Sequence, residues 1–204
     1  MRDDTDADAR YLASCKSVFW QKVFGKELNY LAAELEGCKD LLSVGCGPAV
    51  IEAGLSELGF NVTGLDVSGE CLESAPDSIR KVVARAEEMP FPPESFDAVI
   101  YVVSLQFIDD FQKALNKTAA VLRKGGRLVI LLLNPDSEYY KSRSKEPESY
   151  VSKIKHTNLA MIVYEVARNF SVETEYFLGI RGEDLFDTSN DTEAALYVVK
   201  GSKL

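Results

Sequence analysis

The amino-acid sequence predicts an α/β fold with a mostly parallel sheet and helices on both of its faces. Three observations lead to this prediction. Short apolar runs alternate with segments of helical periodicity, glycine or proline turns separate them, and two strand-like runs without an intervening helix follow near the end. Strands separated by helices pair in parallel through crossovers, whereas two consecutive strands pair as an antiparallel hairpin.

The N-terminal region has the periodicity of helices. Between Ala9 and Leu35, apolar residues recur mostly every three or four positions. Gly25 interrupts this pattern, so we expect two helices broken near it, preceded by a frayed end at residues 1–7. Such helices would flank or cover whatever binds at the sheet, with Phe19 and Trp20 either covering a ligand or packing in the core.

The central alternation supplies five strands and the helices between them. Pro48 suits the first turn of one helix, and Asp110 suits the N-cap of another. The expected segments are, in order, a strand at 41–45, a helix at 48–58, a strand at 61–66, a helix at 69–75, strands at 80–84 and 97–103, a helix at 110–123 and a strand at 127–133. Ligands of such sheets bind beyond the carboxyl ends of the strands.

The pattern changes after residue 135. Residues 136–149 are polar and predict a loop, and residues 150–168 predict a helix. Strands are expected at 172–179 and 194–200, joined by a polar loop. We find no internal repeat and no sign of a second domain.

Composition limits the classes of partner. The 204 residues are 46% hydrophobic and 27% charged, which is typical of soluble globular proteins. No apolar run approaches the ~20 residues that cross a bilayer, and the acidic start MRDDTDADAR has no apolar signal region, so we expect a cytoplasmic protein without a membrane span. The net charge of −9 argues against nucleic acid as a partner. One histidine and four cysteines without a CxxC pair predict no metal site.

The first two expected strands end in residues suited to binding a nucleoside. Gly45-Cys46-Gly47 ends the first, where glycines allow a sharp turn and a close approach of the backbone to a ligand. The N-terminus of the following helix offers unpaired N–H groups to a carboxylate or phosphate. Asp66 ends the second strand, where its carboxylate suits both hydroxyls of a ribose.

Two classes of nucleoside-binding enzyme share this corner, and residue spacing separates them. A dinucleotide fingerprint requires glycine or alanine three residues after its second glycine, and Val50 occupies that position. The 204 residues also lack a second mononucleotide-binding half for a nicotinamide ring. A nicotinamide-dependent oxidoreductase is therefore the weaker hypothesis.

Four motifs are similar, in their order, to those of a known family: LLSVGCG, VTGLDVS, ARAEEMPFPPESFDAVIYVVSLQFIDD and ALNKTAAVLRKGGRLVIL. They lie within residues 40–133. The chain thus resembles the class I S-adenosylmethionine-dependent methyltransferases of the UbiE-like, or type 11, group. The resemblance implies a Rossmann-like sheet of seven strands with an antiparallel strand near the C-terminus. It also implies methyl transfer from S-adenosylmethionine as the activity.

The resemblance further implies which residues bind the methyl donor. Gly45, Cys46 and Gly47 would lie under its methionine part, and Asp66 would hold the ribose hydroxyls. The other expected donor-binding residues lie near the adenine or the transferred methyl group: Val67 beside the adenine, Ala86 donating its N–H to the ring with Glu87 next to it, and Tyr101 and Val102 on the methyl-transfer side.

No residue is marked clearly as a catalytic base. His156, the single histidine, lies in or just before the apolar part of the helix expected at 150–168. Gln106 occupies a position where many relatives carry histidine, and Tyr101 is a third candidate. A sulfonium methyl group is already activated, so methyl transfer needs a base only when the acceptor must lose a proton.

Three residues depart from the family pattern. Ser43 stands where relatives usually carry an acid, Ala49 where they carry glycine, and Arg85 where many carry an aspartate that accepts from the adenine amino group. We expect Ser43 to weaken the polar network around the methionine amino group and Ala49 to narrow the floor of the glycine loop. These departures motivate an alternative, a non-catalytic module that binds S-adenosylmethionine or another protein.

The main hypothesis is a methyltransferase that acts on a small-molecule acceptor without a metal ion. The alternatives are the non-catalytic module and, less favoured, the nicotinamide-dependent oxidoreductase. We expect a single domain. Its expected parts are an N-terminal helical cap at 1–36, a cofactor-binding core at 37–133, a substrate-side cover at 134–168 and a terminal strand pair at 169–204.

Overall fold

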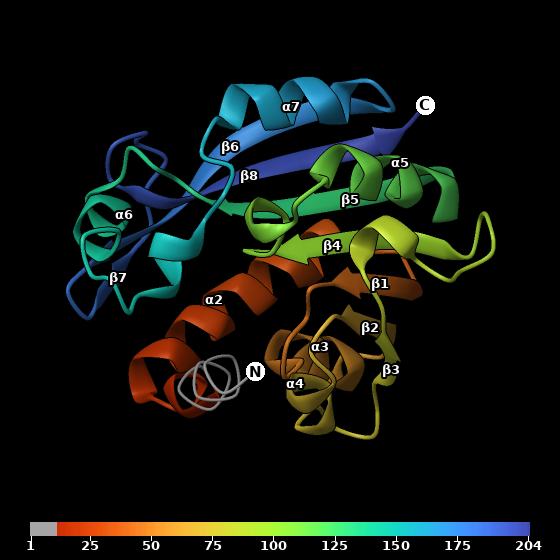
Figure 1. The fold of residues 1–204 in the computed structure, drawn as a ribbon, viewed down its shortest axis with the longest axis horizontal. Helices are drawn as coiled ribbons and strands as arrows, with labels where there is room; N and C mark the ends of the chain where they lie inside the picture. Colours follow the sequence, from red (N-terminus) through yellow and green to blue (C-terminus); the bar gives the residue numbers. More distant parts are fainter. Residues whose placement is uncertain (1–11) are drawn as a thin grey trace.

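One sheet of eight strands runs through the molecule in the computed structural model, which describes residues 12–204 (Figure 1). The strands lie in the order β3-β2-β1-β4-β5-β8-β6-β7. Their bounds are β1 Asp40–Val44, β2 Asn61–Asp66, β3 Arg80–Val83, β4 Phe96–Val102, β5 Leu122–Leu133, β6 Phe170–Arg181, β7 Asp184–Phe186 and β8 Ala194–Lys203. The frayed end expected at residues 1–7 lies outside the described residues.

The strand directions confirm the predicted fold class. β1 to β5 pair in parallel, and β8 pairs antiparallel with both β5 and β6. β7 is an eighth strand, shorter than the others, in the stretch predicted as a polar loop. It pairs with β6 across a two-residue turn at Gly182 and Glu183, and the φ of +61° at Gly182 suits such a turn.

Helices cover both faces of the sheet (Figure 1). α2 and α3 pack on one face, and α5 and α7 pack on the other. The helix bounds are α2 Val18–Glu34, α3 Val50–Glu57, α4 Gly69–Glu73, α5 Phe111–Val121, α6 Glu138–Arg143 and α7 Leu159–Ala167, with 3₁₀ turns η1 Ala86–Glu88, η2 Leu105–Phe107 and η3 Tyr150–Lys153. Between residues 12 and 204, no helix has the length and apolar character needed to cross a membrane.

Two apolar cores result from the alternation of side chains along the central strands. On β1, Leu41 packs in the core with α2 and α3, whereas Leu42 packs in the core with α5 and α7. Both side chains are fully buried, and burial of one leucine contributes about 1.5–3 kcal/mol. The central strands therefore carry mostly apolar side chains on both faces, and their polar side chains lie mainly at the strand ends.

α2 is a single helix, so the predicted break near Gly25 is wrong. Glycine costs an interior helix position about 1 kcal/mol, but the burial of Val23 and Leu31 on the same helix outweighs this. The helix begins after Ser17, whose hydroxyl accepts from the Trp20 N–H at 3.3 Å. Tertiary burial and this cap set the length of α2.

The segment after β5 differs from the prediction in two places. α6 lies within the stretch predicted as a loop, and the Ser137 hydroxyl caps it by accepting from the Tyr140 N–H at 3.1 Å. The helix predicted at 150–168 is two elements, η3 and α7, with irregular backbone at 154–158 between them. Asn158 caps α7 and sets its start.

Gly25→Ala should raise the free energy of unfolding by about 0.5–1 kcal/mol, because alanine has the higher helix propensity. A Cβ added at Gly25 meets no heavy atom within 4 Å. Gly37→Ala is the matched control, since its Cβ also enters open space but its φ of +84° is unfavourable for alanine. Urea unfolding followed by circular dichroism measures both variants. A loss of stability in Gly25→Ala would contradict a continuous α2.

Candidate functional site

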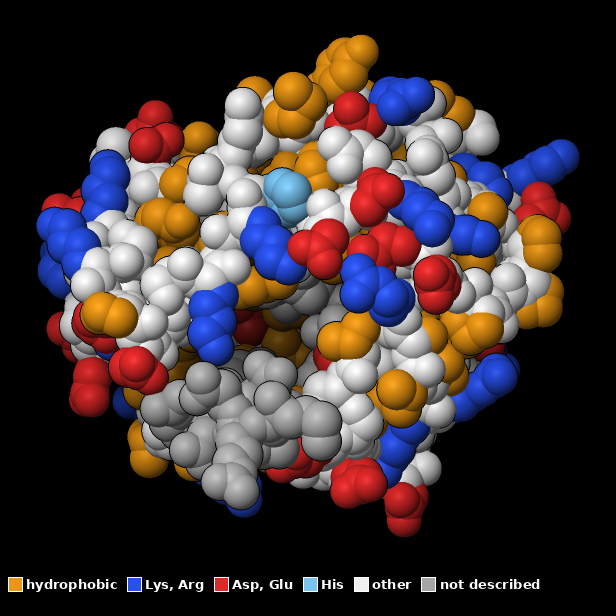
Figure 2. Space-filling model, viewed as in Figure 1, with side chains coloured by type: hydrophobic (Ala, Val, Ile, Leu, Met, Phe, Trp, Pro, Cys, Tyr) orange, Lys and Arg blue, Asp and Glu red, His pale blue; other side chains and the backbone are white. Residues whose placement is uncertain are grey.

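A cavity of about 720 Å³ opens where the carboxyl ends of β1, β2 and β4 meet. The loops after these strands line one side of it, and α2 and the cover at 134–168 line the other. In Figure 2, a hollow lies below the single histidine, and acidic and hydrophobic side chains are visible inside it. Cavities of this size hold small-molecule ligands.

The loop after β1 requires glycine at position 45. Gly45 has φ +72°, and a Cβ added there would lie 2.6 Å from the Cβ of Ser104, in the loop after β4. The Ser104 hydroxyl donates to the Val44 carbonyl at 2.5 Å, and the Gly45 N–H donates to the Leu65 carbonyl at 2.7 Å. These contacts join the ends of β1, β2 and β4 and leave the backbone of the loop facing the cavity.

Asp66 lines the cavity from the end of β2 and holds the glycine loop in place. One of its carboxylate oxygens accepts from the Gly47 N–H at 2.7 Å, and the other accepts from the Ser68 N–H at 2.9 Å. Each carboxylate oxygen has two lone pairs. Both oxygens therefore retain capacity to accept a further hydrogen bond from a ligand in the cavity.

Residues near β3 form the far end of the cavity. Ala86 and Glu87 are buried in η1, and Val67 lines the cavity with a side chain that is 66% exposed. Glu87 accepts from the guanidinium of Arg85 at 2.8 Å, and Arg85 also contacts Asp109 at 3.4 Å. The apolar side chains of Val67 and Ala86 thus lie beside an ion-pair network in which Arg85 is engaged.

Of the two residues predicted at the end of β4, Val102 lines the cavity and Tyr101 does not. Tyr101 is fully buried on the other face of the sheet, and its hydroxyl lies 2.7 Å from the hydroxyl of Thr118 in α5. Successive side chains of a strand point to opposite faces, which separates the two residues. This corrects the expectation that Tyr101 faces the methyl-transfer side.

Gln106 joins β5 to the cover. Its side-chain nitrogen donates to the carbonyls of Leu133 and His156, both at 3.1 Å, and its side-chain oxygen accepts from the Leu133 N–H at 2.7 Å. The Gln106 carbonyl also accepts from the N–H groups of Lys155 and His156. Gln106 is fully buried and is not among the residues that line the cavity, so its contacts position the cover.

His156 is likewise not among the residues that line the cavity. Its Nε2 lies 2.8 Å from the Ile108 carbonyl, and its ring packs against Phe111 with centroids 4.7 Å apart. The structure therefore brings none of the three catalytic candidates, Tyr101, Gln106 and His156, to the cavity.

A buried carboxyl from α3 lies beside Ser43, the position where relatives usually carry an acid. The buried Ser43 hydroxyl donates to Glu52 at 2.5 Å. Glu52 lines the cavity and is 3% exposed, and burial raises its pKa to about 7 by disfavouring the charged form. A carboxyl from the first turn of α3 thus lies within hydrogen-bond distance of the Ser43 hydroxyl.

A second buried carboxyl lines the same cavity and was not predicted. Glu27 is 3% exposed and lies on α2 between Val23 and Leu31 in its buried stripe. Within residues 12–204, its carboxyl makes no hydrogen bond. Burial raises the pKa of Glu27 to about 8, with a smaller contribution from the charge of Glu52. The four-residue spacing of Val23, Glu27 and Leu31 is the sequence signal that marks it.

Four aromatic side chains from three elements line the cavity on the side of α2 and the cover. Trp20 and Phe24 of α2, Phe107 of η2 and Tyr150 of η3 form this group, which we call the aromatic wall. The ring centroid of Trp20 lies 5.9 Å from that of Phe24 and 6.1 Å from that of Tyr150, and Phe107 lies 6.4 Å from Tyr150. Trp20 therefore lines the cavity, whereas Phe19 packs against the core and is not among the lining residues.

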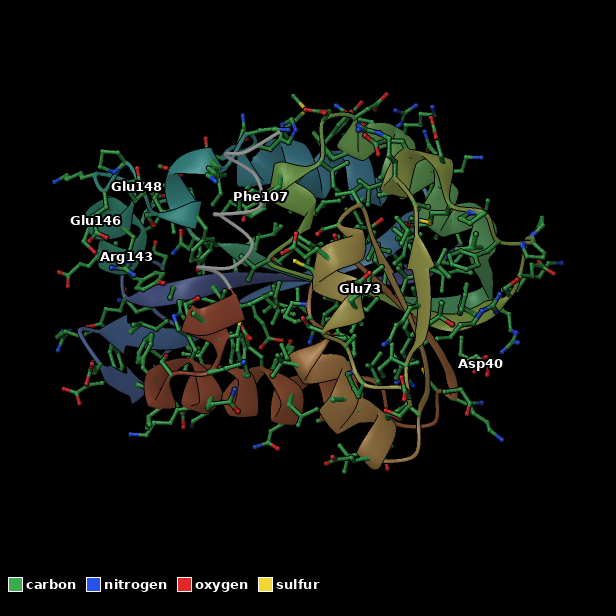
Figure 3. All side chains as sticks on the ribbon, turned by 60° about the horizontal axis from the view of Figure 1, so that its bottom comes forward. Asp40, Glu73, Phe107, Arg143, Glu146 and Glu148 are labelled. Atoms are coloured by element: carbon green, nitrogen blue, oxygen red, sulfur yellow. The ribbon has the colours of Figure 1, made fainter. Side chains whose placement is uncertain are left out.

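Charged residues of the cover lie at the opening of the cavity. In Figure 3, Arg143, Glu146 and Glu148 lie together on the cover, with Phe107 nearer the centre of the molecule. Arg143 donates to Glu146 at 3.0 Å, and Lys155 donates to Asp109 at 2.6 Å. Both cations form exposed ion pairs, which are weak, and the Nε of Arg143 is buried without a hydrogen-bond partner in the described part of the chain.

Two non-glycine residues at the cavity loops have left-handed backbone conformations. Ala49 has φ +56° and directly precedes α3, so Pro48 lies in the turn before the helix and not in its first turn. Val103 has φ +49° and lines the cavity after β4. For a β-branched residue this conformation costs about 1–3 kcal/mol, and such strain concentrates at functional sites.

Residues 42–130 match the family model described as a methyltransferase domain. These residues are therefore similar to a methyltransferase domain. The matched residues include the glycine loop, Asp66, η1 and Val102, which are the parts of the cavity built by the ends of β1 to β4.

Two curated methyltransferases are similar in sequence to part of this chain. The chain is 31% identical to a demethylmenaquinone methyltransferase of Tropheryma whipplei (strain Twist) over 124 residues, which cover 58% of this chain and 50% of that protein. It is 30% identical to a malonyl-[acyl-carrier protein] O-methyltransferase of Erwinia billingiae over 137 residues, covering 62% and 51%. The chain thus spans about half the length of these curated relatives.

One solved structure has a similar fold over nearly the whole length of both chains. It is an S-adenosylmethionine-dependent methyltransferase of Thermotoga maritima, described as a possible histamine N-methyltransferase. The TM-score is 0.81 and the identity is 19%, over 96% of this chain and 95% of the other. At this identity the likeness shows the fold, and it extends beyond the matched methyltransferase domain model to α2, the cover and β8.

Gly45→Ala should lower the free energy of unfolding by about 2–4 kcal/mol, from left-handed strain together with overpacking. The added Cβ would lie 2.6 Å from Ser104. Gly59→Ala is the control, because Gly59 has φ +97° but open space around its Cβ position. Chemical unfolding of both variants separates crowding from strain. Equal losses would show that Ser104 does not restrict the glycine loop.

Glu27→Gln should remove a pH dependence from the stability of the domain. The pKa of Glu27 is about 8 in the folded protein against an ordinary value of 4.5, so the folded state binds the proton more tightly. The contribution of Glu27 to stability is therefore most favourable below the ordinary pKa and declines as the pH rises through 8. The titratable groups whose charges interact with it are Glu52 of α3 and Tyr139 of α6.

The measurement is the difference in unfolding free energy between the wild type and Glu27→Gln. Between about pH 5 and about pH 9 this difference should move by about 2–4 kcal/mol in favour of the variant. Urea titrations at several pH values provide it, with Glu57→Gln on the exposed side of α3 as the control. A difference that stays constant with pH would contradict the burial of an ionisable Glu27.

Proposed function

We propose that the protein transfers a methyl group from S-adenosylmethionine to a small-molecule acceptor. One observation carries the proposal: Gly45, Asp66 and Ala86, which belong to three separate motifs, line one cavity of about 720 Å³. The methyltransferase domain match supports the same activity. S-adenosylmethionine supplies a methyl group on a positively charged sulfur, which needs no further activation.

The residues at the strand ends fit the parts of this donor. Asp66 is proposed to accept from the ribose hydroxyls, using the lone pairs left after its bonds to Gly47 and Ser68. Val67 and Ala86 offer apolar contact to the adenine, and Ala86 and Glu87 form the turn beside it. The backbone of the glycine loop, with Cys46, lies where the methionine part would approach.

Glu52 is proposed to bind the ammonium group of the donor. It lies under the glycine loop, buried and held by the Ser43 hydroxyl. A cation beside a buried carboxyl favours the charged form, so donor binding should lower the pKa of Glu52 from its value of about 7. The pair of Ser43 and Glu52 would then do what a single acid at position 43 does in relatives.

A small-molecule acceptor fits the remainder of the cavity. Beyond the glycine loop, the space is bordered by the aromatic wall and the cover. The relatives are named for different acceptors, demethylmenaquinone and malonyl-[acyl-carrier protein], and the solved structure for a possible histamine activity. These proteins resemble the chain in the core but are named for different acceptors. This supports the proposal that α2 and the cover determine which acceptor binds.

Two other functions remain alternatives. A non-catalytic module that binds S-adenosylmethionine is motivated by the strained Ala49 and by the absence of His156, Gln106 and Tyr101 from the cavity lining. A nicotinamide-dependent oxidoreductase is less favoured, because Val50 opens α3 where the dinucleotide fingerprint needs glycine or alanine.

Calorimetry with S-adenosylmethionine, S-adenosylhomocysteine and NAD separates these functions. The methyltransferase proposal expects binding of the first two and none of NAD. Formation of S-adenosylhomocysteine is then followed across a panel of amines, phenols, carboxylic acids and thiols. Binding of NAD alone would refute the proposal, and binding without turnover across the panel would favour the non-catalytic module.

Asp66→Ala should weaken S-adenosylmethionine binding by about 1–3 kcal/mol, through loss of charge-assisted hydrogen bonds to the ribose. Asp66→Asn is the companion variant, since it keeps one acceptor oxygen and the size of the side chain. Asp187→Ala, at an exposed carboxylate, is the control. Titration calorimetry measures all three. An unchanged affinity in Asp66→Ala would place the ribose elsewhere.

A further inference from the structure

We infer that the methyl acceptor is an amine with an apolar body, which enters as its ammonium form and is held by Glu27 against the aromatic wall. This inference rests on the proposed methyl transfer and names its substrate class. Three features carry it: a carboxyl in the cavity lining without a hydrogen-bond partner among residues 12–204, aromatic rings in the same lining, and a cavity shared with the proposed donor-binding residues.

Glu27 is a carboxyl placed to receive a ligand. It is 3% exposed and lines the cavity, and within residues 12–204 its oxygens meet no hydrogen-bond donor. A cationic donor in the cavity supplies what Glu27 lacks. Its pKa of about 8 also lets it exchange a proton near neutral pH.

The position of Glu27 distinguishes it from the donor-binding acid. Its charge interacts with Glu52 of α3 and with Tyr139 of α6. Glu52 lies under the glycine loop, whereas Tyr139 belongs to the cover that follows β5. Glu27 of α2 thus lines the same cavity as the proposed donor-binding residues and the cover, so an acceptor bound to it would share that space with the donor.

The aromatic wall favours a cation with an apolar body. Trp20 and Phe24 lie one turn apart on α2, on the way from Glu27 to the cover, and Tyr150 and Phe107 continue the wall. Aromatic faces attract ammonium groups, and the attraction is stronger when the group is desolvated. They also pack against aliphatic or aromatic carbon. Arg143 and Lys155 pair with Glu146 and Asp109, and among residues 12–204 no cation forms an ion pair with Glu27.

The reaction balances with Glu27 as the proton acceptor. The ammonium form gives one N–H proton to the Glu27 carboxylate, and the N–H bonding pair becomes the lone pair of the amine. That pair forms the new N–C bond while the C–S bond of the donor breaks and its electrons stay on sulfur. The products are S-adenosylhomocysteine and a methylated ammonium, and the proton on Glu27 leaves to solvent.

Ligand binding to the protein saturated with S-adenosylhomocysteine tests this assignment. The probes are 2-phenylethylamine, 2-phenylethanol and 3-phenylpropanoate, which share a body and differ in charge. The amine should bind at least about tenfold more tightly than the alcohol, because of its charge-assisted contact with Glu27. Equal binding of amine and alcohol, or preference for the carboxylate, would overturn the inference.

Glu27 variants then show whether this carboxyl makes the difference. Glu27→Gln should weaken amine binding by about tenfold and leave alcohol binding within about twofold. Glu27→Asp keeps the charge and should retain a preference for the amine. Formation of methylated amine should fall in Glu27→Gln through kcat as well as KM. Loss of S-adenosylhomocysteine binding in Glu27→Gln, with amine binding unchanged, would assign Glu27 to the donor instead.

The two proposals fail separately. Titration of the wild type with S-adenosylhomocysteine alone comes first, and absence of binding would refute the methyltransferase function. Binding of S-adenosylhomocysteine without preference for amines would leave that function intact and refute the amine acceptor. Glu57→Gln, outside the cavity, should match the wild type in every titration.

Discussion

The close approach of two loops decides how this molecule presents its cavity. The Ser104 hydroxyl bonds the last carbonyl of β1, and the next residue, Gly45, turns away with a φ that favours glycine. A side chain at Gly45 would push Ser104 away and separate the ends of β1 and β4. Because Asp66 bonds the N–H of Gly47, the second strand depends on the same loop. The donor side of the cavity is therefore one rigid corner formed by three strand ends.

Sequence patterns predict that corner well because each of its residues directly follows a strand. The end of an apolar run locates Asp66 in the sequence to within one position. The same precision fails for Tyr101 and Val102, where a shift of one residue exchanges the two faces of β4. The break predicted at Gly25 is wrong for another reason. Burial of Val23 and Leu31 stabilises α2 as one helix, and local helix propensity takes no account of such tertiary burial.

The acceptor side is harder to predict, since its contacts join distant parts of the chain. Trp20 meets Tyr150, and the carbonyl of Gln106 holds the backbone at His156. No periodic pattern links such positions. Glu27 is the exception that a helical pattern marks, because a carboxyl stands at a spacing reserved for apolar residues. A prediction built on histidine as the usual base passes over it, although burial gives a carboxyl the proton affinity that the role requires.

Glu27 and Glu52 are two buried carboxyls in one cavity, and neither forms an ion pair among residues 12–204. Their mutual repulsion matters in addition to the cost of their burial. Glu52 and Glu27 repel one another, and each raises the energy of the empty cavity when ionised. A cation bound between the two carboxylates attracts both, which offsets their repulsion and favours their ionised forms. During methylation of an amine, positive charge leaves the donor sulfur and develops on the acceptor nitrogen. In the proposed reaction Glu27 already holds the proton of the ammonium group when the methyl group is transferred, so its ionised form acts earlier, on the ammonium that enters the cavity, where low polarity strengthens the attraction. The carboxyl pair that weakens the folded chain is thus proposed to be the pair that binds the cationic groups of donor and acceptor.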